Sequence, residues 1–249
     1  MALKPIVVAR GNAADDALVI TCEHGGNLVP PEYASLFTGY ETVLATHRGW
    51  DPGALELAQQ LATAFSAPLI ASTTTRLLVD LNRSIGHPQL YFEATRSLVP
   101  LARRQIMDRY YRPHRDQVEA TVASLITVGR RVVHVASHSF TPELNGIVRQ
   151  ADIAWLYDPK RPGEGVFSYQ WLAAFAQRRP GLKLRRNYPY QGKFDGLTSL
   201  LRKRYAPEQY VGIELEVNQR FAVAGGEPWS GLCMDIVHAL ADTGRFAAK

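Results

Sequence analysis

Two histidines follow apolar, β-branched runs that predict buried strands. His24 lies two residues beyond a strand predicted over residues 17–22, and His138 lies two residues beyond one predicted over 132–136. Open α/β sheets bind ligands just outside the carboxyl ends of such strands. A catalytic zinc takes about three protein ligands and keeps one open position. The two imidazoles therefore predict a metal site that a carboxylate completes.

Asp51 is the candidate for that carboxylate, at the start of a helix predicted over residues 51–65. An Asp before Pro52 at a helix start is also an ordinary N-cap, so metal ligand and helix cap both stay open. His24 has a similar alternative as a packed histidine satisfied by a backbone carbonyl. The glycines after it let the backbone approach a ligand. Glu23 either fixes the imidazole tautomer or is a surface carboxylate.

Even spacing along two predicted strands puts further polar groups on common faces. Glu214 and Glu216 are two residues apart in the predicted strand 211–217, and burying both is costly unless they are paired or functional. One of them is a candidate general base that takes a proton from water, and the alternative is a strand end with two solvated carboxylates. His134 lies four residues before His138, but its apolar surroundings favour a core histidine.

Two arginines flank a short strand predicted over residues 77–81. Arg83, next to Asn82, is suited to gripping a substrate carboxylate because a guanidinium offers a planar, bidentate fork. The alternative is a structural ion pair between Asp80 and Arg83 at a turn. Arg76, before the strand, is a second candidate, for stabilising an oxyanion.

Strands alternate with helices along the chain, which predicts one α/β domain with a mostly parallel sheet covered on both faces. The chain has 249 residues, of which 46% are hydrophobic, enough for a full core. The loop 187–196, rich in Tyr, Pro and Gly, is a candidate substrate loop. Pro113 is expected to kink or split a helical stretch over 100–128. The remaining predicted elements are strands at 68–72 and 153–157 and helices at 165–178 and 228–246.

The chain is basic, with a formal net charge of +5 and a pI of about 9.3. A basic balance can indicate a nucleic acid or a small anionic substrate as partner. The arginines are scattered rather than gathered in a stripe, which favours a solvated surface over a nucleic-acid interface. No apolar run approaches the roughly 18 residues that cross a bilayer, so no membrane partner is expected. Two cysteines in no paired motif favour a reducing compartment, the cytoplasm. The sequence carries no signal for an oligomeric state.

Six short segments, in this order, resemble the N-formylglutamate amidohydrolase family and, more distantly, the zinc carboxypeptidases. The resemblance covers about residues 17–220. It implies a single domain over 1–249 with a mostly parallel mixed sheet flanked by helices, in a zinc-carboxypeptidase-like (phosphorylase/hydrolase-like) fold. The segments are Glu23-His24-Gly25-Gly26 with Pro30, Trp50-Asp51-Pro52-Gly53-Ala54, Val79-Asp80-Leu81-Asn82-Arg83, Ser137-His138-Ser139-Phe140, Pro189-Tyr190 with Asp195-Gly196, and Glu214-Leu215-Glu216 with Asn218.

The resemblance also implies roles for individual residues. His24 and His138 look like zinc ligands. The carboxypeptidases take a glutamate three residues after the first histidine, where this chain has Asn27, so Asp51 is the candidate third ligand. Glu216 is favoured as the catalytic glutamate, with Glu214 fitting almost as well. Asn82 and Arg83 look like the grip on the substrate carboxylate, and the remaining implied substrate contacts are Ser139, Tyr190 and Asp195.

The expected function is that of a Zn²⁺-dependent amidohydrolase that cleaves the formyl amide of a small N-acyl amino acid such as N-formylglutamate. Two alternatives stay open. One is a zinc exopeptidase or deacylase of different acyl specificity, and the other is a relative that binds carboxylates without chemistry.

Overall fold

The computed structural model describes residues 16–247, and a six-stranded sheet runs through them. The strand order is β2-β1-β3-β8-β6-β7, in which β6 is antiparallel to β8 and every other pair is parallel. The predicted α/β domain with a mostly parallel, mixed sheet is confirmed. The strands are β1 Asp16–Cys22, β2 Leu69–Ala71, β3 Arg131–Phe140, β6 Ile153–Leu156, β7 Leu184–Arg186 and β8 Tyr210–Asn218.

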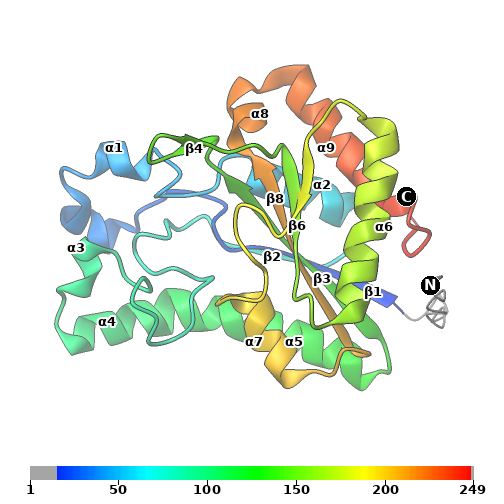
Figure 1. Cartoon of the computed structure of the whole chain (residues 1–249). Helices are drawn as coiled ribbons and strands as arrows, with labels where there is room; N and C mark the ends of the chain where they lie inside the picture. The colour runs from blue at the N-terminus through cyan, green and yellow to red at the C-terminus, as the bar shows by residue number, and fades with distance from the viewer. Residues whose placement is uncertain (1–15, 248–249) are drawn as a thin grey trace.

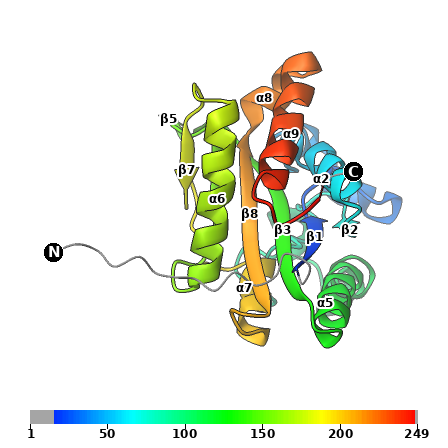
Figure 2. The same ribbon diagram turned by 90° about the vertical axis from the view of Figure 1, so that its right-hand side faces the viewer.

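Helices cover both faces of this sheet (Figure 2). Alternate residues of a strand point to opposite faces, and β1 divides its side chains in this way. Ile20 packs in the core formed with α2 (Ala54–Phe65), α6 (Pro162–Arg178) and α9 (Gly226–Ala241). Val19 packs on the other side, against α5 (Arg112–Thr127) and α7 (Leu197–Arg204). Burial on both faces explains why the central strands are almost continuously apolar.

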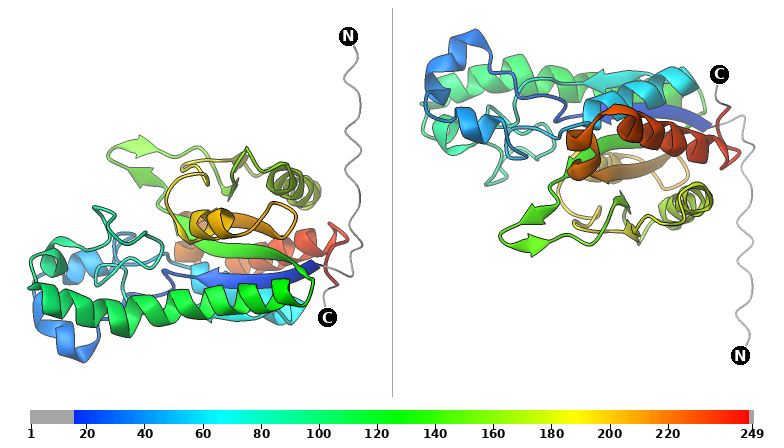
Figure 3. Two further views of the ribbon diagram at one scale, coloured as in Figure 1. Left: turned by 90° about the horizontal axis from the view of Figure 1, so that it is seen from below. Right: turned by 90° about the horizontal axis from the view of Figure 1, so that it is seen from above.

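A group of short elements lies beyond one end of the sheet, apart from α6 and α9 (Figure 1). The hairpin of β4 and β5 extends at the same end of the molecule (Figure 3). Apart from α4, which lies in the helical stretch predicted over 100–128, these elements were not predicted, because each is too short to show a hydrophobic period. They are η2 Pro31–Phe37, α1 Glu41–Leu44, α3 Glu93–Arg96, α4 Pro100–Ile106, β4 Glu143–Leu144 and β5 Ile147–Val148.

The predicted strand at 77–81 is wrong, because this segment is a series of turns. Its backbone hydrogen bonds are local or run to another loop: Leu78 N–H donates to Thr75 O, and Asp80 N–H donates to Leu90 O. The apolar side chains are buried all the same, in a separate cluster with Phe37 and Ile106. An apolar run thus predicted burial correctly and backbone conformation incorrectly.

The helical stretch at 100–128 is divided as expected near Pro113. A π-helical segment, η3 (Met107–Tyr111), separates α4 from α5, and Pro113 falls in the first turn of α5. Proline lacks an N–H donor, and a first helical turn needs none there. π-helical turns of this kind accommodate a local interruption of the regular hydrogen-bond ladder.

Other predicted elements differ mainly at their ends. The closing helix ends at Ala241 rather than 246, and the short α8 (Gln219–Ala224) precedes it. The loop at 187–196 is confirmed, while β7 and α7 on either side of it were not predicted. Across residues 16–247, none of the helices has the length and apolar character needed to cross a membrane.

Candidate active site

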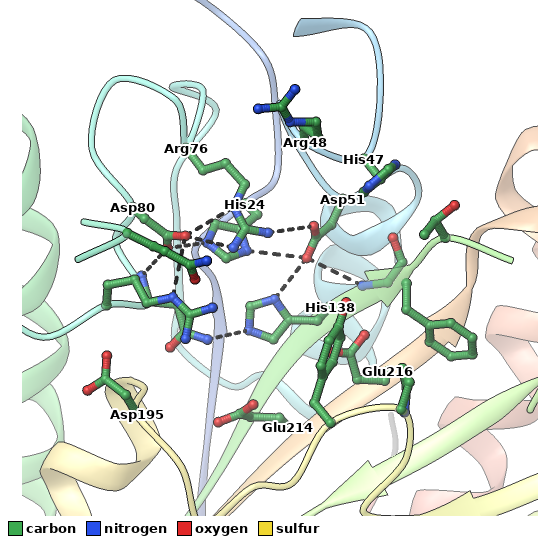
Figure 4. A pocket seen from close by; sticks show the side chains of 18 of the residues that line it. His24, His47, Arg48, Asp51, Arg76, Asp80, His138, Asp195, Glu214 and Glu216 are labelled. Atoms are coloured by element: carbon green, nitrogen blue, oxygen red, sulfur yellow. Dashed lines mark hydrogen bonds and ion pairs between the residues drawn. The ribbon is translucent and has the colours of Figure 1, made fainter. Parts of the chain in front are cut away.

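Three buried side chains meet beyond the carboxyl end of β1 (Figure 4). His24 Nδ1 lies 3.3 Å from Asp51 Oδ2, and His138 Nδ1 lies 2.9 Å from the same oxygen. The two ring centroids are 5.1 Å apart. Two imidazole nitrogens and a carboxylate oxygen facing one another form a group that could hold a metal ion. The sequence therefore predicted correctly that these three residues lie together.

The backbone around His24 explains how this meeting is built. The N–H of Asp51 donates to His24 O at 2.9 Å, which pins the loop before α2 to the end of β1. A Cβ atom on Gly26 would lie 2.6 Å from Thr73 O. The glycines after His24 therefore permit close approach of the 72–74 backbone, whereas the sequence suggested close approach to a ligand.

Asp51 does not cap the helix that follows it. The N-cap residue of α2 is Gly53, and no side chain makes a capping hydrogen bond there. Burial would raise the pKa of Asp51, but the charge of His24, hydrogen bonds from His138 and His24, and the charge of Arg76 hold that pKa well below its usual range. Its carboxylate is therefore ionised and aimed at the two imidazoles.

A second buried carboxylate stands behind each imidazole. His24 Nε2 lies 2.7 Å from Asp80 Oδ1, and His138 Nε2 lies 3.2 Å from Glu23 Oε2. A carboxylate on one ring nitrogen fixes the ring orientation and leaves the other nitrogen to a ligand. Glu23 is fully buried, which excludes the surface alternative, but the imidazole that it faces is that of His138 and not, as the sequence suggested, that of His24. Burial would lower the pKa of His138, but Asp51 and Glu23 raise it well above its ordinary value.

Arg76 holds the carboxylate behind His24. Its guanidinium donates to Asp80 Oδ2 through Nη2 at 2.6 Å and Nε at 3.1 Å, and Nη1 reaches Asp51 at 3.4 Å. Arg83 Nε lies 4.0 Å from Asp80, so the ion pair considered from the sequence is the weaker one. Asp80 was not recognised as a site residue, although it lies in the same sequence segment as Asn82.

Glu216 and Glu214 both line the pocket, in different surroundings. Glu216 pairs with His138 across β8 and β3, is 5% exposed, and its Oε2 has no hydrogen-bond partner among the described residues. Burial is the main cause that raises the pKa of Glu216 to about 8. Glu214 Oε1 accepts a hydrogen bond from the Thr198 hydroxyl at 2.6 Å. Glu214 is thus held through one oxygen by the Thr198 hydroxyl, whereas no hydrogen bond within residues 16–247 restrains Glu216 Oε2.

A pocket of about 680 Å³ opens over these groups. Arg83 lines it with a side chain that is 28% exposed, and within residues 16–247 its guanidinium donates no hydrogen bond. The Asn82 amide is already held at its oxygen, since its Oδ1 accepts from Leu197 N at 2.8 Å. Arg83 therefore keeps donors for a ligand, while Asn82 mainly braces the site.

Three other predicted substrate contacts line the pocket while bonded elsewhere. Ser139 donates to Pro52 O at 2.8 Å, which braces the Asp51 loop. Asp195 accepts from the backbone and hydroxyl of Ser84. The Tyr190 hydroxyl accepts a hydrogen bond from Arg149 at 3.0 Å. Their predicted contacts with substrate stay predictions.

Several charged groups around the pocket could not be recognised from the sequence. Arg149 stacks on the rings of Phe140 and Tyr190, and Arg48 lies over the ring of Phe92. Burial, then the positive charges of Arg149, Arg76 and Arg48, lower the pKa of His47 in the pocket wall. Asp51 acts on this imidazole in the opposite direction, and the three guanidinium groups place positive charge on this side of the pocket.

The comparison with known sequences agrees with this geometry. The chain matches the family model of N-formylglutamate amidohydrolase over residues 16–223. The protein belongs to the N-formylglutamate amidohydrolase family, and it is an amidohydrolase. No curated protein matches it by sequence.

Solved structures with the same fold include two that cover nearly the whole chain. The gene product Atu2144 from Agrobacterium tumefaciens is 28% identical, with a TM-score of 0.78 over 94% of this chain and 92% of that one. An N-formylglutamate amidohydrolase from Ralstonia eutropha JMP134 is 18% identical, with a TM-score of 0.68 over 92% of this chain and 94% of that one. At 18% identity the second likeness shows the fold alone.

Proposed function

We propose that this protein is a zinc-dependent amidohydrolase that removes the formyl group from N-formylglutamate or a closely similar N-acyl amino acid. The observation that carries the proposal is the buried group of His24, Asp51 and His138, with a buried carboxyl, Glu216, beside His138. Family membership supports the reaction class.

The donor set fits zinc. Two imidazole nitrogens and one carboxylate oxygen are the ligand types of catalytic zinc sites, which leave a position open for water or substrate. Carboxylates behind both imidazoles supply the outer contacts that such ligands usually have. A bound zinc supplies Lewis-acid chemistry, polarising an acyl oxygen and acidifying water.

Glu216 is the proposed general base. Its Oε2 has no competing hydrogen bond in the part of the chain that the structure describes, and it faces the pocket beside His138. It takes a proton from the attacking water and passes it to the leaving amine, so that formate and a free amino acid are released. Glu214 is the less favoured candidate because Thr198 already occupies one of its oxygens.

The substrate side of the proposal rests on positive charge. Arg83 binds the α-carboxylate, and Asn82 holds the loop that presents Arg83. The Tyr190 hydroxyl accepts from Arg149 and keeps its own proton free to donate to a substrate oxygen. Arg76 stays a candidate for stabilising the oxyanion, although Asp80 and Asp51 engage its nitrogens. The partner is a small anion and no nucleic acid. Two free, buried cysteines support a cytoplasmic setting.

The test is hydrolysis by the zinc-loaded protein of a panel of N-acyl amino acids, measured as amine release. N-formylglutamate should be the preferred substrate, with N-formylglutamine and N-acetylglutamate slower. Preference for a larger acyl group or a dipeptide would move the protein to the deacylase or exopeptidase alternative. Hydrolysis of no member of the panel, with zinc bound, would favour a carboxylate-binding protein.

A further inference from the structure

His114 lies behind the candidate metal site and was not singled out from the sequence. It belongs to the first turn of α5, is 7% exposed, and its Nε2 lies 3.6 Å from Glu23 Oε1. The other oxygen of that carboxylate lies 3.2 Å from His138 Nε2. One buried carboxylate therefore joins the histidine of a helix to the histidine of a strand.

Glu23 depends on these two rings. It is fully buried, and among the described residues neither of its oxygens has a hydrogen-bond partner of regular geometry, so the imidazoles of His138 and His114, at 3.2 and 3.6 Å, are left to supply the donors. A buried carboxylate that lacks donors is strongly unfavourable, so its neighbours must supply them. If His138 uses Nδ1 as a ligand, its Nε2–H can satisfy one oxygen of Glu23. The second oxygen is then left to His114.

Two hydrogen bonds beside His114 connect the start of α5 to the loop that carries Asn82. Tyr111 donates to Arg83 O at 2.7 Å, and Arg115 donates to Leu81 O at 3.0 Å. Tyr111 lies three residues before His114, on the same side of the helix, and Arg115 directly follows His114. The residues around His114 therefore contact the loop that carries Asn82 as well as Glu23.

We infer that His114 is a positioning residue for the metal centre, which orients Glu23 and through it the imidazole of His138. This inference rests on the metal site of the proposed function. His114 touches neither substrate nor metal, and its contribution is to metal affinity. Groups that hold the ligands of a metal commonly change the metal affinity by about 10- to 100-fold when they are removed.

The test compares two amides of different reach. In His114→Gln the amide nitrogen falls near the place of Nε2 and can still donate to Glu23, whereas His114→Asn places it near Nδ1, out of reach. Zinc affinity is measured by competition with a chromophoric chelator, together with the visible spectrum of the cobalt-substituted protein. His114→Asn should bind zinc about 10- to 100-fold more weakly, and His114→Gln should stay within about threefold of wild type. The cobalt spectrum should change only in His114→Asn.

Val118→Ala is the matched control, since Val118 is buried on the same face one turn further along α5. It should lower the unfolding temperature and leave zinc affinity unchanged. Equal affinity in all variants, an equal loss in the Gln and Asn variants, or a loss in Val118→Ala would overturn the inference. Wild-type protein that binds zinc but hydrolyses no substrate would overturn only the proposed function, because the affinity comparison needs no activity.

Discussion

His134 and His138 lie four residues apart on the same strand and have opposite surroundings. His134 is fully buried, with Thr21 Oγ1 at 2.8 Å and Tyr210 OH at 2.7 Å from its ring nitrogens. His138 lies between Asp51 and Glu23. Burial is the main cause that lowers the pKa of His134 to about 4, whereas the pKa of His138 is raised. His134, between two hydroxyls, is thus a neutral core residue, whereas His138, between two carboxylates, is a candidate metal ligand.

The same substitution at both positions should give opposite results. His138→Gln keeps a donor for Glu23 but lacks the Nδ1 ligand, so bound zinc and hydrolysis should both fall by more than about a thousandfold. His134→Gln should keep zinc and activity and lose about 1–3 kcal/mol of unfolding free energy. Metal analysis, kinetics and urea unfolding check the pair. Full activity in His138→Gln would contradict the assignment of His138 as a metal ligand.

The proposed base gives the next largest effect. Glu216→Gln should retain zinc and lower kcat by about 10²- to 10⁴-fold, because it removes the proton acceptor beside His138. Glu214→Gln is the control and should lower kcat far less, since its carboxylate already bonds to Thr198. The reverse order of the two variants would assign the base to Glu214.

In metal-free protein, the pH dependence of the unfolding free energy should reveal the lowered pKa of His134. The unfolded chain takes up the proton near the ordinary histidine pKa of about 6.5, but the folded protein takes it up only near pH 4. Stability supplied by neutral His134 is therefore full above pH 6.5 and is lost as the pH falls toward 4, by about 3 kcal/mol. Urea unfolding across this window should show that slope in wild type and a shallower one in His134→Gln. Parallel curves would contradict the assigned surroundings.

The smallest effect is expected at the mouth of the pocket, away from β3. Tyr190→Phe removes the hydroxyl that Arg149 contacts and should raise KM for an anionic substrate by about three- to tenfold, with zinc content unchanged. Tyr188→Phe is the control, because Tyr188 bonds to the backbone of Gln150 outside the pocket. Equal changes in both variants would show a general effect on the loop.

The central strands β1, β3 and β8, and the positions of His24 and His138 near the carboxyl ends of β1 and β3, could be predicted because buried β-branched runs have a clear pattern. The same pattern led to a wrong strand at 77–81. These residues are apolar because they are buried in the separate cluster with Phe37 and Ile106, although their backbone forms turns. His24 and His138 could be brought together by topology, because carboxyl ends of neighbouring parallel strands share one edge. Asp51, which lies before a helix, was added because the site needed a carboxylate and the family resemblance implied one there. His114 and Arg149 could not, because their roles depend on tertiary contacts that leave no local period or motif.

The most direct test is a crystal structure of the zinc-loaded protein with anomalous data at the zinc edge. We predict a single strong peak held by Nδ1 of His24, Nδ1 of His138 and an oxygen of Asp51, with both Nε2 atoms facing Asp80 and Glu23. No peak among these residues, or a zinc held by Glu214 or Glu216 in place of Asp51, would contradict the account.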